Sequence, residues 1–184
     1  MYKCLKTMFL NIITPCSRPE NLQKIAQSIN IPKEWYRWIV VFDAETVPDI
    51  NIDAELYAIK DSKSTSGNAQ RNYGLDQVTS GHVYFNDDDT TLHPELWDSI
   101  KDLDNDFISF RQVWKSGALR LTGFNVSLNN IDSHNFITSN CLIGDTRWVL
   151  DRYDADGLFA YECRQKSKTY RYIDRILSVY NSLK

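Results

Sequence analysis

Three consecutive carboxylates, Asp87, Asp88 and Asp89, follow the short apolar run His82–Phe85. Adjacent like charges repel one another, so a cation or several hydrogen-bond donors must offset them if they converge. On an extended chain, Asp87 and Asp89 point to one face and Asp88 to the other. Mg²⁺ and Mn²⁺ bind one or two protein carboxylates and complete their coordination with phosphate and water oxygens. The triplet therefore indicates either a site for a metal-bound diphosphate or a solvated acidic turn before a helix.

Apolar runs upstream of the triplet predict the elements that would position it. Met8–Ile13 and Trp38–Phe42 are typical of buried strands, and Glu20–Ile29 between them has the spacing of an amphipathic helix. Strand, helix and strand in this order predict a parallel βαβ unit, whose ligands bind beyond the carboxyl ends of the strands. Thr14–Arg18 and Asp43–Glu45 should therefore lie on the same edge of the sheet as the triplet.

The remaining patterns predict an α/β domain with a mostly parallel central sheet flanked by helices. Further strands are expected at Leu56–Ile59, His82–Phe85, Asp106–Trp114 and Leu119–Leu128, and further helices at Gly67–Val78, Pro94–Leu103, Asp145–Tyr153 and Thr169–Leu183. The polar stretch Asn129–Asn140 is expected to be a loop. No repeat, low-complexity linker or composition shift marks a second domain, so residues 1–184 are interpreted as one domain.

Composition and charge exclude several classes of protein. The net charge is −3, and the 21 Lys and Arg are scattered, which argues against nucleic acid or an anionic membrane as a partner. The apolar run Met8–Ile13 is too short for a signal peptide or a transmembrane helix, so a cytoplasmic protein without a membrane segment is expected. Cys4, Cys16, Cys141 and Cys163 lack the spacing of a zinc site and are interpreted as reduced thiols.

Four segments together resemble the donor-binding half of glycosyltransferases with the GT-A fold. They are ITPCSRPE (Ile13–Glu20), WIVVFDAE (Trp38–Glu45), NAQRNYGL (Asn68–Leu75) and VYFNDDDTT (Val83–Thr91). In order and spacing they are most similar to the animal β-1,3-glucuronyltransferase family. The resemblance implies a single GT-A domain in which about residues 1–100 bind a nucleotide-sugar and about residues 101–184 bind the acceptor.

The resemblance also implies roles for residues upstream of the triplet. Thr14 and Pro15 would line the nucleotide pocket, with Arg18 on the same loop, and Asp43 would accept the N3 proton of uracil. Arg71 would lie beside the triplet and the donor. A structural ion pair with Asp87 or Asp76 on the helix surface is the alternative interpretation of Arg71.

Within the triplet, the resemblance implies that Asp88 holds the ribose and that Asp89 ligates Mn²⁺ or Mg²⁺ bridging the diphosphate. Asp87 is a second candidate for the metal and the donor. The chemistry is consistent with this, because departure of a nucleoside diphosphate develops negative charge that a divalent cation stabilises as a Lewis acid.

An inverting transfer also needs a carboxylate that removes the proton of the acceptor hydroxyl. Asn140–Arg164 resembles the acceptor side of GT-A enzymes, with Glu162 in place of the second acid of a pair and Tyr161 in place of the first. Glu162 is therefore the expected base, with Asp154 and Asp156 as competitors. A helix acid stabilised by the macrodipole is the alternative interpretation of Glu162.

The sequence thus predicts a metal-dependent, inverting glycosyltransferase that moves a sugar from a UDP-sugar to a hydroxyl of a glycan or glycoprotein. A retaining enzyme of the same fold, a sugar-phosphate nucleotidyltransferase and a non-catalytic cation- or carbohydrate-binding module stay open as alternatives. The nucleotidyltransferase normally carries an early Gly-rich loop, and glycine is absent before Gly67. Trp114, Trp148 and Tyr161 are candidates for stacking on a sugar.

Overall fold

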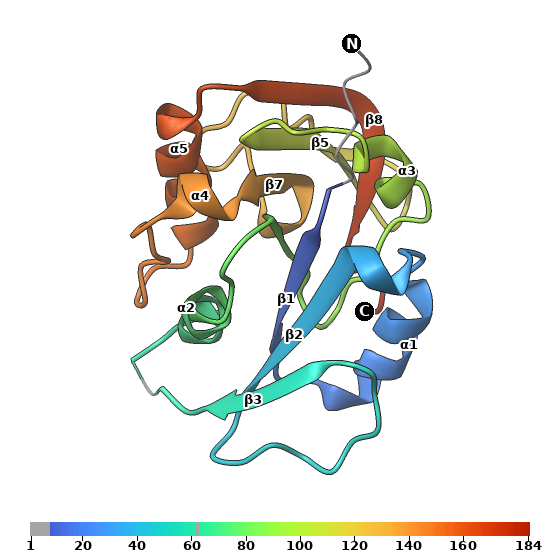
Figure 1. Cartoon of the computed structure of the whole chain (residues 1–184), viewed down its shortest axis with the longest axis vertical. Helices are drawn as coiled ribbons and strands as arrows, with labels where there is room; N and C mark the ends of the chain where they lie inside the picture. Colours follow the sequence, from blue (N-terminus) through green and yellow to red (C-terminus); the bar gives the residue numbers. More distant parts are fainter. Residues whose placement is uncertain (1–7, 62) are drawn as a thin grey trace.

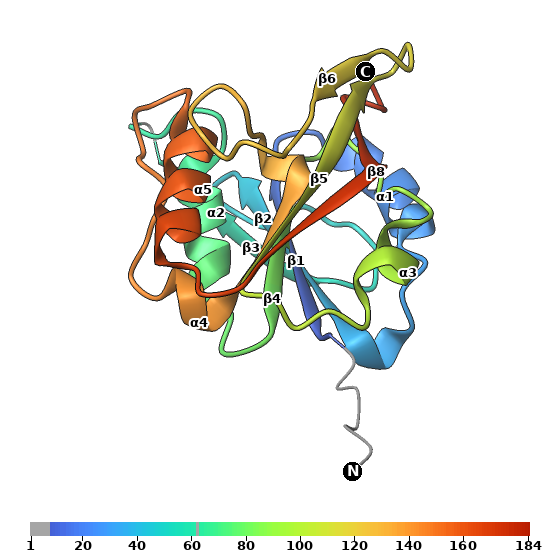
Figure 2. The same ribbon diagram turned by 90° about the horizontal axis from the view of Figure 1, so that it is seen from above.

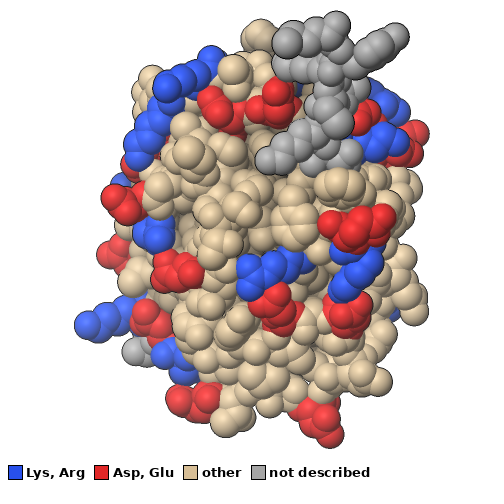
Figure 3. All heavy atoms as spheres, in the orientation of Figure 1, with Lys and Arg blue, Asp and Glu red and all other residues tan. Residues whose placement is uncertain are grey.

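The computed structural model describes residues 8–61 and 63–184 of the chain. These residues form an eight-stranded mixed sheet with helices on both faces (Figure 1), which confirms the predicted fold class. Cys4, interpreted as a reduced thiol, lies outside the described residues. Lys and Arg are interspersed with Asp and Glu on the face seen in Figure 3, as their scattered positions in the sequence predict. No helix in the described ranges is long and apolar enough to cross a bilayer.

The first half of the sheet is parallel and has the strand order β3-β2-β1-β4. Its strands are β1 (Leu10–Cys16), β2 (Tyr36–Asp43), β3 (Glu55–Ile59) and β4 (His82–Phe85). The chain runs outward from β1 to β3 and then returns to the other side of β1. The loops after β1 and β4 therefore diverge at a topological switch point, where open α/β sheets bind ligands.

Helices cover both faces of this sheet (Figure 2). On one face lie α2 (Asn68–Asp76), α4 (Asn140–Ile143) and α5 (Ala155–Lys166), and on the other α1 (Leu22–Ser28) and α3 (Leu96–Ile100). Short 3₁₀ helices occur at Pro19–Asn21, Lys33–Trp35 and Ser133–Asn135.

Each helical layer forms its own hydrophobic cluster against the sheet. Successive side chains of a strand point to opposite faces, so Ile12 packs in the cluster under α1 and α3 while Ile13 packs under α2 and α5. All seven residues of β1 are buried, as is typical of a parallel strand covered on both faces.

The second half of the sheet is largely antiparallel. It contains β5 (Phe107–Trp114), β6 (Leu119–Leu121), β7 (Phe136–Ser139) and β8 (Tyr170–Tyr180). The pairs β4–β7, β7–β5 and β5–β6 are antiparallel, whereas β8 is parallel to β5. The predicted parallel character therefore holds for the β1–β4 half and for the β5–β8 pair.

Two predictions about the second half are wrong. Thr169–Leu183, expected to be a helix, contains β8, because its aromatic and β-branched residues pack against β5 and its backbone pairs with that strand. Asn129–Asn140, expected to be a loop, contains a 3₁₀ helix and β7. The predicted strand Leu119–Leu128 ends at Leu121, two residues before Gly123 adopts a positive φ of 70°.

The helix expected at Asp145–Tyr153 is also absent, and α5 begins after it instead. Asparagine side chains of α2 hold this segment in an irregular conformation. Asn68 Nδ2 donates to the carbonyl oxygen of Val149 at 2.9 Å, and Asn72 both accepts from and donates to the backbone of Trp148 at 2.8 and 2.9 Å. These bonds replace the intrahelical ones and fasten the segment to α2.

We expect Gly74→Ala to lower the free energy of unfolding by about 1–3 kcal/mol, although alanine favours a helix intrinsically. A Cβ at Gly74 would lie 2.5 Å from Cγ2 of Ile13 in the buried strand β1. Urea unfolding measures the effect.

The matched control is Asp76→Ala in the same helix. It breaks an exposed ion pair with Arg147 and should change stability by less than about 1 kcal/mol. Equal effects of the two substitutions would contradict close packing of α2 on β1.

Candidate active site

A cavity of about 580 Å³ opens at the carboxyl ends of β1, β2 and β4. Its walls come from both halves of the chain. The first half contributes the loop after β1, the end of β2, the start of α2 and the acidic triplet; the second contributes β6, the segment before β7, the loop before α5 and the C-terminal residues. The edge of the sheet that was predicted to bind a ligand therefore contains a cavity.

Asp88 fastens the loop after β1. Its Oδ2 accepts hydrogen bonds from the backbone N–H groups of Ser17 at 2.6 Å and Arg18 at 2.7 Å, and its Oδ1 accepts from Arg18 Nε at 2.8 Å. The carboxylate is 2% exposed. Both oxygens are thus engaged by the loop, so Asp88 shapes the wall of the cavity, and the expected ribose contact would have to compete with these bonds.

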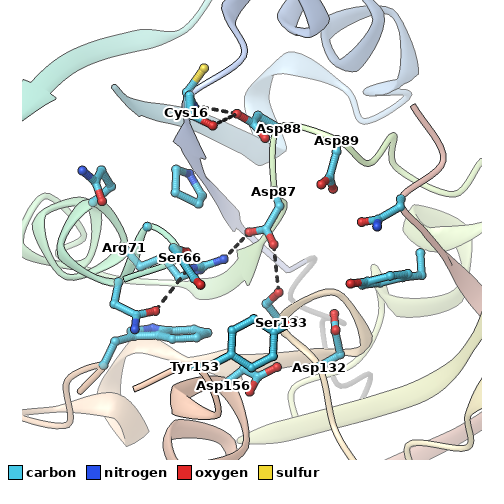
Figure 4. A pocket seen from close by; sticks show the side chains of 18 of the residues that line it. Cys16, Ser66, Arg71, Asp87, Asp88, Asp89, Asp132, Ser133, Tyr153 and Asp156 are labelled. Atoms are coloured by element: carbon cyan, nitrogen blue, oxygen red, sulfur yellow. Dashed lines mark hydrogen bonds and ion pairs between the residues drawn. The ribbon is translucent and has the colours of Figure 1, made fainter. Parts of the chain in front are cut away.

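Asp87 points to the opposite side, toward Arg71 and Ser133 (Figure 4). Arg71 forms an ion pair with Asp87 and is 4% exposed. Arg147 takes the other possible partner, Asp76. Arg71 therefore lies beside the triplet, and its ion pair belongs to the cavity wall.

Asp89 faces two cations. Its Oδ2 lies 2.9 Å from Arg18 Nη2 and 2.6 Å from Lys184 Nζ. Burial raises the pKa of Asp89, but the hydrogen bond from Lys184 and the nearby cations outweigh burial and lower it. Asp88 and Asp89 share Arg18, so the expected alternation, with Asp87 and Asp89 on one face, is wrong. The chain turns at Asp88 and Asp89 instead of staying extended.

Asp89 can ligate a divalent cation as a single carboxylate. The Lys184 ammonium contacts Asp89 Oδ2, and its side chain is 51% exposed whereas that of Asp89 is 6% exposed. Within residues 8–61 and 63–184, no group of three His, Cys, Asp or Glu side chains could hold a metal unaided. Asp87, the second expected ligand, is engaged by Arg71.

A buried chain of polar groups links Asp87 to the second half of the sheet. The backbone N–H of Asp87 donates to Nε2 of His134 at 2.9 Å, Nδ1 of His134 lies 2.9 Å from Asp132, and Asp132 lies 3.0 Å from Arg120. The Asp87 N–H requires a lone pair on Nε2, so we assign the neutral imidazole with its proton on Nδ1.

Three residues of the cavity wall, Asp132, Arg120 and Lys184, were not predicted from the sequence. One local signal was present, because Asp132 and Asn135 form a reciprocal capping box around the 3₁₀ helix before β7. Arg120 and Lys184 carry no such signal, since only the sheet pairing brings β6 and the C-terminal residues to the triplet.

The candidate bases occupy different environments. Glu162 is the eighth residue of α5, has a side chain that is 52% exposed, bonds to Lys166 and Thr146, and is not part of the cavity wall. Asp154 lines the cavity, but its ion pair with Arg152 lowers its pKa.

Asp156 has the environment expected of a general base. It lines the cavity from the first turn of α5 and lies across from Asp88 and Asp89 (Figure 4). Burial, reinforced by the negative charge of Asp132, raises its pKa to about 6. Of the candidate bases, the structure thus places Asp154 and Asp156 in the cavity wall and Glu162 outside it, and the role of base stays a prediction.

The side of the cavity expected to bind the nucleotide contains Asp43 and Pro15. Asp43 ends β2, lines the cavity and lies 3.1 Å from the exposed Lys60 ammonium. Thr14 is fully buried and accepts a hydrogen bond from Trp38 Nε1 at 3.0 Å, so it lies behind the wall and not in it. Apart from Thr14, Glu162 and the two stacking candidates Trp114 and Tyr161, all the expected site residues line this one cavity.

The sequence matches no protein-family model and no curated protein. Solved structures do match the fold. A crystal structure of S. aureus TarS residues 1–349 aligns with a TM-score of 0.74 and 18% identity over 94% of this chain and 60% of that one. The same fragment in complex with UDP-GlcNAc aligns with a TM-score of 0.71.

The mannosyltransferase PcManGT from Pyrobaculum calidifontis, in complex with GDP-Man and Mn²⁺, aligns with a TM-score of 0.67 and 12% identity over 95% of this chain. The chain spans 57% of PcManGT and 60% of the TarS fragment. At these identities the likeness shows the fold, a GT-A-like glycosyltransferase fold.

We expect Asp156→Asn to raise the free energy of unfolding by about 2 kcal/mol near pH 8. The folded protein raises the pKa of Asp156 from 3.8 to about 6, so between these values it binds the proton more tightly than the unfolded chain does. Wild-type stability should fall as the pH rises through this window, and the advantage of the variant should vanish below about pH 4. Urea unfolding at several pH values measures this.

Asp154→Asn is the control, because the pKa of Asp154 is shifted downward and its side chain is partly exposed. It should give no gain in stability at alkaline pH. A gain for Asp156→Asn that persists at pH 4 would have another origin than its titration.

Proposed function

We propose that the chain is a glycosyltransferase domain that moves a sugar from a nucleoside diphosphate sugar, with UDP as the nucleotide, to a hydroxyl of a glycan or glycoprotein. The observation that carries the proposal is the cavity at the switch point of the sheet, with the triplet on one side and Asp156 on the other. The domain comprises residues 1–184, with the donor bound mainly by residues 1–100 and the acceptor by residues 101–184.

The nucleotide binds beside Pro15 and Asp43. The Asp43 carboxylate accepts the N3 proton of uracil after exchanging its exposed partner Lys60 for the base. Two observations support this position of the nucleotide. Asp43 lines the same cavity as the loop after β1, and hydrogen bonds to Asp88 hold that loop in place. The complex of TarS with UDP-GlcNAc and the resemblance to animal β-1,3-glucuronyltransferases support a UDP-sugar.

The diphosphate binds at the triplet. A divalent cation held by Asp89 in place of the Lys184 ammonium would stabilise the negative charge that develops on the leaving diphosphate. Arg18 lies beside Asp89, and Arg71 is held next to Asp87, so both guanidinium groups line the wall that the diphosphate faces. The complex of PcManGT with GDP-Man and Mn²⁺ supports a metal requirement.

Asp156 removes the proton of the acceptor hydroxyl. With a pKa of about 6 it is largely ionised at neutral pH and still basic enough to accept a proton in the transition state. Its position across the cavity from the triplet suits attack opposite the leaving diphosphate, and hence inversion at the transferred carbon. Tyr153, 85% exposed at the cavity wall, offers an aromatic face for an acceptor sugar.

We expect Asp89→Asn to lower the affinity for UDP measured with Mn²⁺ at least about tenfold, because the amide is a weaker ligand for a hard cation than the carboxylate. Isothermal titration calorimetry with UDP, with and without Mn²⁺, measures this.

Glu162→Gln serves as the matched control, since Glu162 lies outside the cavity. GDP tests the base pocket and should bind more weakly than UDP. Wild-type protein that ignores UDP would refute the proposal in favour of a cation- or carbohydrate-binding module, and unchanged affinity in Asp89→Asn would refute the metal ligand.

We expect Asp156→Asn to lower turnover about 10²-fold or more, the order typical of a lost general base, with UDP affinity nearly unchanged. Release of UDP from a panel of UDP-sugars, with water or simple glycosides as acceptors, measures turnover. Glu162→Gln should retain near-normal turnover because its carboxylate bonds to Lys166 outside the cavity. The reverse ranking of the two variants would return the base to Glu162, and full activity of both would contradict inversion.

A further inference from the structure

Three aromatic residues were candidates for stacking on a sugar, and the structure separates them. Trp148 lines the cavity but is only 3% exposed, and the Arg71 guanidinium covers its ring at 4.6 Å. Tyr161 is 43% exposed on α5, outside the cavity wall. Trp114, at the end of β5, is 46% exposed and also lies outside the wall, but its ring meets that of Tyr180, which lines the cavity. Trp114 is therefore the candidate that has both an accessible ring and a connection to the cavity.

The pairing of β5 with β8 places Trp114 beside Tyr180. The two residues are partners in this parallel pair, and their rings meet edge-on with centroids 5.2 Å apart. The guanidinium of Arg120 on β6 covers the Tyr180 ring at 3.9 Å and lies 5.2 Å from the centre of the Trp114 ring. These three side chains form one cluster, here called the rim cluster, and two of them, Arg120 and Tyr180, line the cavity.

Buried hydrogen bonds hold the rim cluster in place. Arg120 Nη1 donates to Gln112 Oε1 and lies 3.0 Å from Asp132 Oδ2. Gln112 is fully buried, and its Nε2 donates to Asp132 Oδ1 and to Ser178 Oγ, each at 3.2 Å. Side chains that are fixed before a ligand arrives lose little conformational freedom on binding. The rim cluster therefore has the rigidity of a preformed binding surface.

Arg120 also retains hydrogen-bond donors for a ligand. Its Nε and Nη2 groups have no hydrogen-bond partner within residues 8–61 and 63–184, and neither is among the buried unpaired atoms of these residues. Both are therefore accessible, in a side chain that is 20% exposed and belongs to the cavity wall. This edge of a guanidinium presents two parallel N–H groups to two neighbouring oxygens. Adjacent hydroxyl groups of a sugar provide such oxygens.

The charge of the cavity favours a neutral ligand at the rim cluster. The described part of the wall contains seven aspartates and four Arg or Lys residues, and Arg120 is already paired with Asp132. The proposed donor brings further negative charge on its diphosphate. A carboxylate or phosphate on the acceptor would add like-charge repulsion, whereas sugar hydroxyls accept the N–H groups of Arg120 without adding any.

The rim cluster lies on the side of the cavity proposed to bind the acceptor. Its strands β5, β6 and β8 all belong to residues 101–184. Asp132, the partner of Arg120, is close enough to Asp156 for its charge to raise the pKa of that proposed base. A sugar whose hydroxyl reacts at Asp156 would therefore place the next unit of the same glycan toward the rim cluster.

We infer that the rim cluster is a second acceptor subsite. Trp114, beside Tyr180, stacks on the apolar C–H face of a neutral sugar unit, and Arg120 donates to the hydroxyl oxygens of that unit. This unit neighbours the one whose hydroxyl reacts at Asp156, so the acceptor is a glycan of at least two sugar units. The inference rests on the proposed function and specifies its acceptor.

The test begins with a glycan array of neutral and anionic mono- and oligosaccharides, probed with the wild-type protein in the presence of UDP and Mn²⁺. Isothermal titration calorimetry then compares the glycan that binds best with the methyl glycosides of its units. The glycan should be neutral and should bind at least about tenfold more tightly than any single unit. Trp114→Ala should lower its affinity about three- to tenfold, as expected for one aromatic contact, and leave UDP within about twofold.

Phe124→Ala is the matched control, because Phe124 is an aromatic residue of the same half that is 66% exposed and does not line the cavity. It should leave the affinities for the glycan and for UDP within about twofold. Trp114→Tyr, which retains an aromatic ring, should recover most of the affinity that Trp114→Ala loses. Arg120→Lys keeps a positive charge beside Asp132 but removes the guanidinium edge, and it should weaken the glycan about as much as Trp114→Ala.

A second measurement uses the wild-type protein, so it does not depend on a variant that folds. In ¹⁵N spectra of the indole N–H groups, the Trp114 signal, identified by its absence from Trp114→Tyr, should shift on addition of the selected glycan. It should stay in place with UDP alone and with the methyl glycoside of the reacting unit.

Several outcomes would overturn the inference: single units that bind as tightly as the glycan, full glycan affinity in Trp114→Ala, an equal loss in Phe124→Ala, or a Trp114 signal that the glycan does not shift. So would an array on which only anionic glycans bind, or none. These outcomes leave nucleotide binding intact, whereas a wild-type protein that does not bind UDP would refute the proposed function itself.

Discussion

The repulsion among three consecutive carboxylates is the constraint around which the site is organised. Each carboxylate is compensated by a cation from a different part of the chain: Arg71 of α2 for Asp87, Arg18 of the β1 loop for Asp88, and Arg18 with Lys184 for Asp89. Because these partners come from three directions, the side chains diverge instead of converging on one point. The same ion pairs therefore shape the cavity, and Lys184 is the most exposed of the cations that compensate the triplet.

Asp156 differs from the triplet because no side chain pairs with it. Its Oδ1 accepts a hydrogen bond from the Gly157 N–H at 2.7 Å, and burial beside the negative charge of Asp132 raises its pKa to about 6. Asp132 itself is paired with Arg120 and His134, which keeps its pKa low despite burial. Compensated acids on one wall and an uncompensated acid on the other correspond to the two tasks of the proposed reaction, stabilising charge and accepting a proton.

The two halves of the site are joined through α2. Asn68 and Asn72 bond to the backbone of the loop before α5, while Arg71 between them pairs with Asp87 and covers Trp148. Helix α2 thus holds in place the loop before α5, which belongs to the half of the chain proposed to bind the acceptor. The residues proposed to bind the diphosphate and the loop that leads to the proposed base are held by the same short element, which would favour a fixed distance between leaving group and base.

Local patterns in the sequence determined the β1–β4 half and the edge on which the triplet lies. Short apolar runs indicate buried strands directly, and the 3.6-residue spacing indicates the helices that cover them. They did not determine β8, because its apolar residues Tyr170, Ile173, Leu177 and Tyr180 recur at the spacing of a helix, and only pairing with β5 decides for the strand that its aromatic and β-branched residues favour. Nor did they assign the base: Glu162 and Asp156 lie six residues apart on α5, and only packing of that helix against the sheet buries Asp156 at the cavity and leaves Glu162 outside. Tertiary structure decided these points because side-chain burial and ion pairing depend on strands and loops that are distant in sequence, such as Arg120 and Lys184.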